Sequence, residues 1–402
     1  MHIPSERVWK EMCSEPASTW FVSAKGTDSH AILFKAPTNI LKAIVSGCLV
    51  EIIFGVAHVR EKRIVCTATK IHDDSQSPFI ESGVQKSRED LQALIEILNR
   101  VSTPVFLFDE LGRCVSWAES VFDQNKVAQV LSLLQNPETL FYGEFDQDAS
   151  EALDCFDLSI DPSRAFKNAR LIPIVLIGLS FAEFNHLNLT AIGVNEVHSF
   201  NLDEKNEGLG LEQSVWHLLE NLFSFRIFRS PKVIVGGKAR ELTDILCLSQ
   251  YGIFVFETKE MAVLSTSQDR SMERKVKGLQ KQIRKGLGQI CGSVRTIRAG
   301  NRIISDKGNE IIFDTTIVPH GIIVVSELLP FGSWDELVKE TIDLMSKHKI
   351  IIHILDLREL RLLIGASKTD NIFDYYLMKR FKSFSQIQDI HIRVNFIKPE
   401  ER

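Results

Sequence analysis

Two carboxylates and a lysine gather at one end of an apolar segment of this chain. Two apolar runs flank a Ser-Gln-Tyr-Gly turn, a pattern typical of a β-hairpin. If the hairpin closes symmetrically about the Gln-Tyr pair, Asp244 faces Glu257, and like charges opposed in this way repel. Lys259 then lies beside Glu257, because side chains alternate between the two faces of a strand. A divalent metal ion would stabilise such a cluster. The alternative is a solvent-exposed ion pair between Glu257 and Lys259, which the apolar residues on both faces of the hairpin disfavour.

The helical pattern before the hairpin contributes a third carboxylate. Val215, Trp216, Leu219 and Phe223 recur at the spacing of one buried helix face, and Glu212 falls on the same face. A carboxylate that points toward the core needs a partner, because burial of an unpaired charge is costly. The alternative is a first-turn glutamate that the helix dipole favours.

A long basic helix is expected after the hairpin, from Met272 to Arg298. Its only acid is Glu273, and its basic residues, with those beside its ends, are Arg270, Arg274, Lys275, Lys277, Lys281, Arg284, Lys285, Arg295, Arg298 and Arg302. An ordinary solvated helix face is one interpretation, and binding to a phosphate backbone is the other. The residues expected to contact nucleic acid are Lys275, Lys277, Lys281, Gln282, Arg284 and Lys285.

The hairpin resembles the PD-(D/E)XK signature of restriction-endonuclease-like nucleases. Asp244 is followed by a gap of twelve residues and then by Glu257-Thr-Lys259, while Thr243 stands where the name-giving proline would be. The surrounding sequence is most similar to the Mrr-like and nuclease-related (NERD) branch of that superfamily. In that branch a helical glutamate precedes the hairpin, a role that Glu212 would fill. A glutamine-bearing helix follows it, and the candidates here are Gln280, Gln282 and Gln289.

The resemblance, which spans about residues 207–300, implies Mg²⁺-dependent hydrolysis of phosphodiester bonds, with Mn²⁺ as a substitute. Asp244 and Glu257 would supply hard oxygen ligands, Glu212 would add a carboxylate, and the Thr258 carbonyl would complete the shell. The metal would polarise the scissile phosphodiester or lower the pKa of an attacking water. Lys259 would orient that water or stabilise the charge that develops on the phosphate.

Length and composition are those of an ordinary globular protein with room for two or three domains. The 402 residues are 44% hydrophobic and 25% charged. The seven cysteines form no C-x-x-C or zinc-ligand spacing, which favours a reducing compartment. The most apolar window, residues 40–57, contains charges and is too short to span a bilayer. The sequence therefore predicts a cytoplasmic protein without a signal peptide or a membrane span.

Charge divides the chain into an acidic front and a basic back. Residues 1–210 carry 18 Lys and Arg against 29 Asp and Glu, whereas residues 211–402 carry 29 against 23. The polar, glycine-bearing stretch 201–210 is the best linker candidate. We therefore expect an α/β protein with an N-terminal mixed α/β domain at 1–205. A PD-(D/E)XK nuclease-like domain at 206–402 would hold a mixed sheet flanked by helices.

Local patterns predict the remaining elements. In the first half we expect strands at 31–34, 50–54, 63–66, 104–108 and 171–179, helices at 88–100 and 121–134, and a surface loop at 141–161. In the second half, we expect strands at 232–235, 321–325, 350–355 and 391–396, and helices at 334–347, 358–364 and 373–381. Asp356 and Glu359 fit either a second carboxylate pair or a helix cap, and His217 is expected on the flank of its helix.

Together these features predict a Mg²⁺-dependent deoxyribonuclease, an endonuclease in prokaryotic antiphage defence or restriction. The N-terminal domain would have a regulatory or specificity role or bind a protein partner, and a cut through both strands would favour a homodimer. The alternative is a catalytically inactive nuclease-fold protein that binds nucleic acid or assembles a defence or repair complex. The residues leave open whether DNA or RNA is cut, and whether cleavage is internal or from ends.

Overall fold

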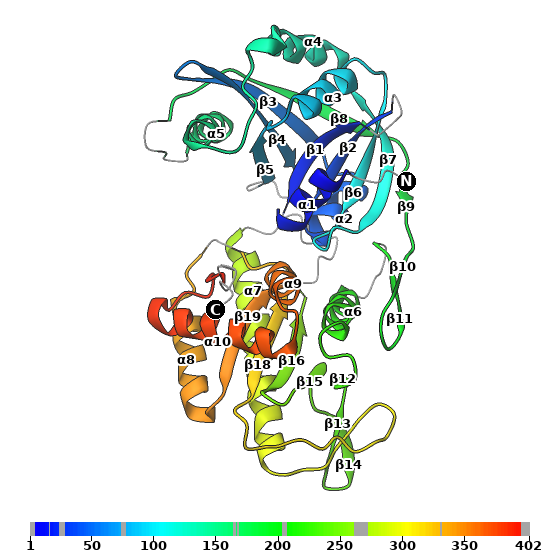
Figure 1. Ribbon diagram of the computed structural model, residues 1–402, viewed down its shortest axis with the longest axis vertical. Coiled ribbons are helices and arrows are strands. Elements are labelled where there is room, and N and C mark those ends of the chain that lie inside the picture. Colours follow the sequence, from blue (N-terminus) through cyan, green and yellow to red (C-terminus); the bar gives the residue numbers. More distant parts are fainter. Residues whose placement is uncertain are drawn as a thin grey trace. The chain divides into compact units, whose positions relative to one another are not determined.

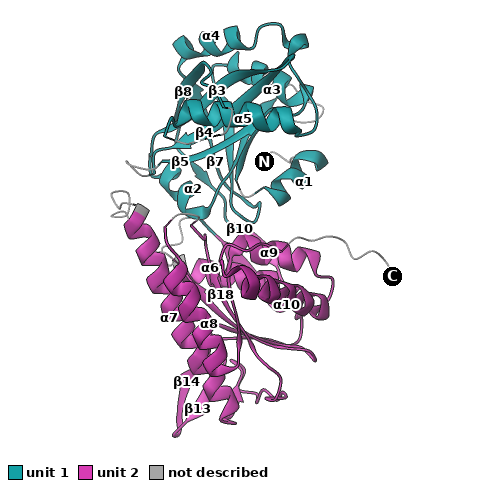
Figure 2. Ribbon diagram, turned by 90° about the vertical axis from the view of Figure 1, so that its left-hand side faces the viewer, with its two compact units in different colours: residues 1–189, 201–203 teal, residues 190–200, 204–402 magenta. Residues whose placement is uncertain are grey.

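The computed structural model forms two compact units, residues 1–189 with 201–203, and residues 190–200 with 204–402 (Figure 2). The described residues are 5–15, 17–23, 29–73, 78–163, 166, 169–202, 207–260, 272–329 and 332–394. The predicted domain boundary lies between residues 205 and 206, and the units differ from it in residues 190–200 and 204–205, which belong to the second unit. Arg270 and part of the linker candidate 201–210 lie outside the described residues.

A nearly closed, barrel-like sheet forms the centre of the first unit (Figure 1). Its order is β1-β2-β6-β7-β8-β3-β4-β5, in which β2 and β6 are parallel and the other neighbours antiparallel. The edge strands β1 and β5 contact each other, and the hydroxyl oxygens of Thr19 in β1 and Thr69 in β4, the neighbour of β5, are 2.6 Å apart. The strands are β1 (Ser18–Ser23), β2 (His30–Lys35), β3 (Val50–Val59), β4 (Lys62–Ile71), β5 (Phe79–Val84), β6 (Thr103–Phe108), β7 (Cys114–Phe122), β8 (Ile174–Phe181) and β9 (Asn185–His186), which pairs with β7.

The strands predicted at 31–34, 50–54, 63–66 and 104–108 are confirmed within longer strands. The strand predicted at 171–179 begins later, at Ile174, and is only partly buried. The helices of this unit are α1 (Glu6–Ser14), α2 (Thr38–Val45), α3 (Arg88–Leu98), α4 (Gln124–Leu133) and α5 (Gln147–Ile160), with a short 3₁₀ turn η1 (Pro137–Thr139).

One helix prediction and one loop prediction in this unit need correction. The helix expected from residue 121 begins at Gln124, because residues 121 and 122 complete strand β7. The loop expected at 141–161 is wrong, because α5 occupies most of it. Asp146 caps this helix by accepting a hydrogen bond from the Ala149 N–H, and Phe156 packs into the face of β3 and β4. Acidic residues interspersed along α5, one of which, Asp148, is itself buried, masked this apolar periodicity.

A five-stranded mixed sheet forms the core of the second unit, in the order β12-β15-β16-β18-β19. Strands β12, β15 and β16 are antiparallel, whereas β16, β18 and β19 run parallel. The strands are β12 (Ile227–Arg229), β15 (Ile245–Leu248), β16 (Ile253–Lys259), β18 (His320–Val325) and β19 (Ile351–Asp356). The helices are α6 (Glu207–Glu220), α7 (Met272–Arg298), α8 (Asp335–His348), α9 (Leu357–Ala366) and α10 (Asp370–Ile387).

Helices cover both faces of this sheet. Helices α7 and α8 lie side by side on one face, where their apolar residues pack against alternate strand residues such as Val255 and Ile323 (Figure 2). On the other face, Phe254 of β16 contacts the rings of Phe223, which follows α6, and Phe373 in α10. The prediction of a mixed sheet flanked by helices is thus confirmed at this coarse level. Each strand of the hairpin is apolar on both sides because both sides are covered.

Two small sheets extend the second unit. Strand β13 (Lys232–Val235) pairs with β14 (Lys238–Glu241) and β17 (Ile303–Ile304), and the β13–β14 turn is formed by Gly236 and Gly237 with φ of 57° and 76°. The predicted strand and its tight glycine turn are confirmed. Strand β10 (Leu189–Ile192) and strand β11 (Val197–Phe200) form a separate two-stranded hairpin.

The strand expected at 391–396 is wrong over its described part, because residues 391–394 belong to no strand. The His391 side chain instead hydrogen-bonds the Asp389 carboxylate and the Leu329 carbonyl oxygen, which fixes this segment outside the sheet. Residues 395 and 396 lie outside the described part of the chain. No helix among the described residues is long and apolar enough to cross a bilayer.

We expect Gly321→Ala to destabilise the second unit by about 1–3 kcal/mol, since overpacking forces neighbours to shift. A Cβ atom at Gly321 in β18 would overlap Ile290 of α7 and lie 3.0 Å from Ile350 Cδ1. The control is Gly365→Ala in α9, where the added methyl meets nothing within 4 Å and should stabilise by about 0.5–1 kcal/mol. Urea unfolding measures both, and changes of equal sign would contradict the packing argument.

Candidate active site at the end of the β15–β16 hairpin

The hairpin closes in the predicted register. Leu246 faces Val255 and Ile245 faces Phe256, so that paired residue numbers keep a constant sum toward Asp244. The turn is held by Ser249, whose hydroxyl accepts hydrogen bonds from the N–H groups of Tyr251 and Gly252. Asp244 immediately precedes β15 and therefore lies at the end of β16 that carries Glu257.

The Asp244 carboxylate binds the neighbouring strand. Its Oδ2 accepts the Thr258 N–H at 2.6 Å and the Thr258 hydroxyl at 2.9 Å. Thr243, where the signature would have proline, donates its hydroxyl to the Phe256 carbonyl at 2.6 Å. Both contacts tie the entry of β15 to the exit of β16, so the position of Asp244 is fixed by two strands.

Glu257 and Lys259 form an ion pair inside the protein. Lys259 Nζ donates to Glu257 Oε2 at 2.8 Å and to the Thr258 carbonyl oxygen at 2.9 Å, and it lies 3.8 Å from Asp244 Oδ2. The Glu257 residue is only 1% exposed. The alternative of a solvent-exposed ion pair is therefore wrong, because Glu257 and Lys259 are both buried.

Burial and the nearby Asp244 carboxylate raise the pKa of Glu257 to about 7, although Lys259 opposes this shift. In metal-free protein, the folded state then holds this proton more tightly than the unfolded chain, whose glutamate titrates near 4.5. The stability contributed by this group is complete below about pH 4.5 and is lost as the pH rises to about 7. The loss amounts to about 3 kcal/mol at most.

We therefore expect the free energy of unfolding of wild type, measured in EDTA, to fall between pH 4.5 and 7 relative to Glu257→Gln. Groups remote from Glu257 contribute equally in both proteins and cancel in the difference. Chemical unfolding at a series of pH values gives this difference directly, and parallel curves would contradict the raised pKa.

Glu212 is held by Arg229 and also lies near enough to Asp244 for the Asp244 charge to raise the pKa of Glu212. The predicted apolar face of α6 is confirmed, since Val215 and Leu219 are fully buried. Glu212 Oε1 accepts a hydrogen bond from Arg229 Nε at 2.9 Å. Burial raises the pKa of Glu212, and the Arg229 guanidinium lowers it in part. Helix α6, which carries Glu212, covers the face of the sheet that includes Phe254. Glu257 is on the opposite face, with Val255, so Glu212 and Glu257 approach the strand end from opposite faces of the sheet.

Helix α7 has the predicted bounds and lies antiparallel to β16. A Cβ at Gly286 would lie 3.2 Å from Ile323, whose register partner in β16 is Glu257. Gln282, one turn earlier, therefore lies toward the strand ends that carry Lys259. Val276 and Ile283 are among the residues that bury the apolar face of α7.

The basic residues of α7 differ in their exposure and in their ion pairs. Lys281 and Lys285 are exposed. Arg284 Nε donates to Glu340 Oε2 of α8 at 2.9 Å, whereas Lys277 pairs with Glu273 at 2.6 Å within α7. Lys275 and Gln282 are half-buried. The other glutamine candidates divide as well: Gln280 donates to the Ser333 carbonyl and Gln289 is exposed.

Asp356 and Glu359 belong to a buried charge network. Asp356 accepts the Glu359 N–H at 2.7 Å, so the helix-cap interpretation is confirmed. Glu359 accepts from Arg380 Nε at 3.0 Å and from Arg393 at 2.8 Å, and Arg393 also binds Asp356 at 2.6 Å. Two guanidinium groups thus neutralise both acids.

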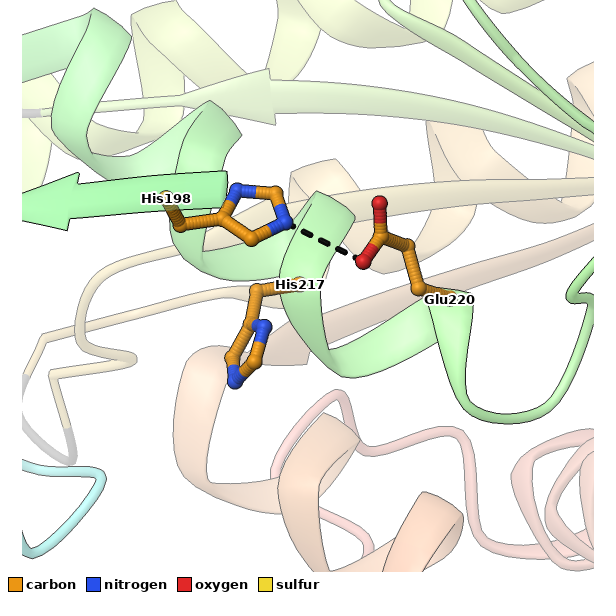
Figure 3. Close-up of side chains that lie close together, drawn as sticks. All are labelled: His198, His217 and Glu220. Atoms are coloured by element: carbon orange, nitrogen blue, oxygen red, sulfur yellow. Dashed lines mark hydrogen bonds and ion pairs between the residues drawn. The ribbon is translucent and has the colours of Figure 1, made fainter. Parts of the chain in front are cut away.

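The sequence did not reveal a second cluster, made of His198, His217 and Glu220 (Figure 3). Among the described residues, it is the group of three or more histidine, cysteine or acidic side chains whose ligand atoms all lie within 4.8 Å of one another. The spacing of His217 and Glu220, three apart on α6, was a usable signal. His198 comes from β11, and nothing local indicates that β11 packs against α6.

Comparisons with protein-family models, curated proteins and solved structures found no match for this chain. The likeness to the PD-(D/E)XK superfamily therefore stays a prediction from the hairpin residues.

Proposed function

We propose that this protein is a Mg²⁺-dependent nuclease whose active site lies at the end of the β15–β16 hairpin. The observation that supports this function most is the convergence of three oxygens on one positive charge. Lys259 Nζ lies within 4 Å of Glu257 Oε2, the Thr258 carbonyl oxygen and Asp244 Oδ2. Two carboxylates and a carbonyl are the hard donors that Mg²⁺ takes in proteins, so the residues present fit the ion.

Each residue of this site would have its own task. Asp244 and Glu257 would hold the ion together with the Thr258 carbonyl, and the Thr258 N–H and hydroxyl would keep Asp244 in place. Bound Mg²⁺ would polarise the scissile phosphodiester and lower the pKa of a water molecule. Lys259 would place its ammonium group against the negative charge that develops on the phosphate.

The arrangement of elements supports a restriction-endonuclease-like fold for residues 206–402. Helix α6, the antiparallel hairpin, helix α7 and the parallel strands β18 and β19 follow one another as the resemblance implies. Helix α7 places exposed Lys281 and Lys285 beside the sheet, near the level of Glu257. Fixed cations next to a metal site suit a phosphate backbone, and DNA is the proposed substrate. We assign the role to prokaryotic defence or restriction, with the N-terminal unit as a specificity or partner-binding domain.

One observation favours a second function. The Lys259 ammonium group occupies the centre of the three oxygens, and Arg229 already neutralises Glu212. A protein that kept these ion pairs permanently would bind nucleic acid without cutting it, as a subunit of a defence or repair complex.

The test is cleavage of labelled duplex DNA, single-stranded DNA and RNA by the full chain in Mg²⁺ or Mn²⁺, with EDTA as the control. Metal-dependent product from DNA is the expected result. If only RNA were cleaved, the protein would still be a phosphodiester hydrolase, but its substrate would be RNA and not DNA. No product with either metal, together with salt-sensitive binding, would establish the binding function and overturn catalysis.

A further inference from the structure

The cluster of His198, His217 and Glu220 unites two segments of the second unit. His198 lies on β11, whereas His217 and Glu220 lie three residues apart on α6 and therefore share one helix face. His198 Nε2 is 3.1 Å from Glu220 Oε2, and the two imidazole rings are 4.9 Å apart between centroids (Figure 3). His198 and Glu220 are buried, and His217 is half-buried.

The surroundings hold these side chains in place. Trp216 Nε1 donates to Glu220 Oε1 at 2.6 Å, and the Val194 N–H donates to Oε2 at 3.1 Å. A Cβ at Gly193 would overlap Glu220 Oε2, so the backbone of the β10–β11 turn can approach the carboxylate closely only with glycine there. Phe200 packs beside both histidine rings. Ligands fixed in this way need little reorganisation to bind an ion.

We propose that His198, His217 and Glu220 bind a transition-metal ion, Zn²⁺, as a site separate from the hairpin carboxylates. Two imidazole nitrogens and one carboxylate oxygen form a ligand set that Zn²⁺ accepts, with the fourth position left to water or another donor. Mg²⁺ prefers oxygen ligands and is disfavoured by the imidazoles. The separation of 3.1 Å between His198 Nε2 and Glu220 Oε2 is close to the roughly 3.3 Å expected between two ligands of tetrahedral zinc with bonds of about 2.0–2.1 Å.

Zn²⁺ in this site would fasten the β10–β11 hairpin to α6. The turn of that hairpin also carries Glu196, which lies 3.4 Å from Arg229 Nη1, and Arg229 in turn holds Glu212. The hairpin is otherwise a separate two-stranded sheet, so a metal crosslink would fix its position on the second unit. The site therefore has a structural task that does not depend on nuclease activity.

The test is Zn²⁺ titration of the full chain after dialysis against EDTA, with the metal content then measured by mass spectrometry. We expect about one tightly bound equivalent, and tetrahedral Co²⁺ absorption bands when Co²⁺ replaces Zn²⁺. His217→Ala and Glu220→Gln should each weaken Zn²⁺ binding by at least about 10–100-fold. His217 is half-buried and Glu220→Gln keeps the shape of its side chain, so both variants should fold, which circular dichroism checks.

Two control variants separate this site from the others. His58→Ala removes an exposed histidine of the first unit and should leave Zn²⁺ binding unchanged. Asp244→Asn disrupts the hairpin site and should still bind about one equivalent of Zn²⁺, whether or not the protein is a nuclease. Zn²⁺ affinity equal to wild type in both His217→Ala and Glu220→Gln would overturn the proposal, as would loss of the equivalent in Asp244→Asn or the absence of Zn²⁺ binding in wild type.

Discussion

Replacement of Glu257 by glutamine is expected to lower Mg²⁺-dependent DNA cleavage by at least about 100-fold, because one of the two proposed carboxylate ligands becomes a neutral amide. The loss should appear in the cleavage rate at saturating Mg²⁺. DNA binding should change little, because the exposed cations of α7 are untouched. Initial rates on labelled duplex DNA measure the first effect, and fluorescence anisotropy without Mg²⁺ measures the second.

The matched control is Glu241→Gln, which removes an exposed carboxylate at the end of β14, close to the hairpin in sequence. It should leave the cleavage rate within about two-fold of wild type, since exposed charges contribute weakly. An equal loss of cleavage rate in both variants would mean that the rate depends on the net charge near the hairpin and does not depend on Glu257 as a metal ligand. Full activity of Glu257→Gln would remove Glu257 from the site.

Arg380→Met is expected to destabilise the second unit by about 3 kcal/mol or more. Arg380 and Glu359 are each 2% exposed, and their ion pair is 3.0 Å long. Arg380 also donates to the carbonyl oxygens of Ile354 and Ile390. Methionine fills a similar volume but leaves the buried carboxylate and both carbonyls with fewer donors, and breaking a buried pair costs much more than forming it gains. The free energy of unfolding from guanidinium titration gives the result.

The comparison is with an exposed ion pair in the same unit. Arg302 Nε lies 3.1 Å from Glu310 Oε2, and both side chains are exposed. Arg302→Met should change stability by less than about 1 kcal/mol, because water screens the pair. If the two substitutions had similar effects, burial would not be the source of the Arg380 contribution.

Local pattern was sufficient for the hairpin and the elements next to it. The register that opposes Asp244 and Glu257 followed from turn symmetry, because the two strands are adjacent in sequence and pairing has a period of two. The buried face of α6 and the bounds of α7 followed from helical periodicity in the same way. The position of Lys259 beside Glu257 needed only the alternation of side chains along one strand.

The features that could not be predicted from the sequence depend on contacts between distant segments. No local signal could indicate that Arg229, on an edge strand, would bind Glu212, or that β11 would carry His198 to α6. The near closure of the first sheet, with Thr19 beside Thr69, likewise depends on strands far apart in the chain. Helix α5 escaped detection for a different reason, since acidic residues are interspersed among its apolar residues along the sequence.

Arg229 contacts two glutamates, and this has a thermodynamic consequence for the two proposed ion sites. Arg229 binds Glu212 on one side and, through Glu196, the hairpin that would carry the zinc ligand His198. If zinc loading alters the affinity for Mg²⁺ by some factor, Mg²⁺ must alter the affinity for zinc by the same factor. Two independent titrations of the same protein would then have to report one common coupling free energy.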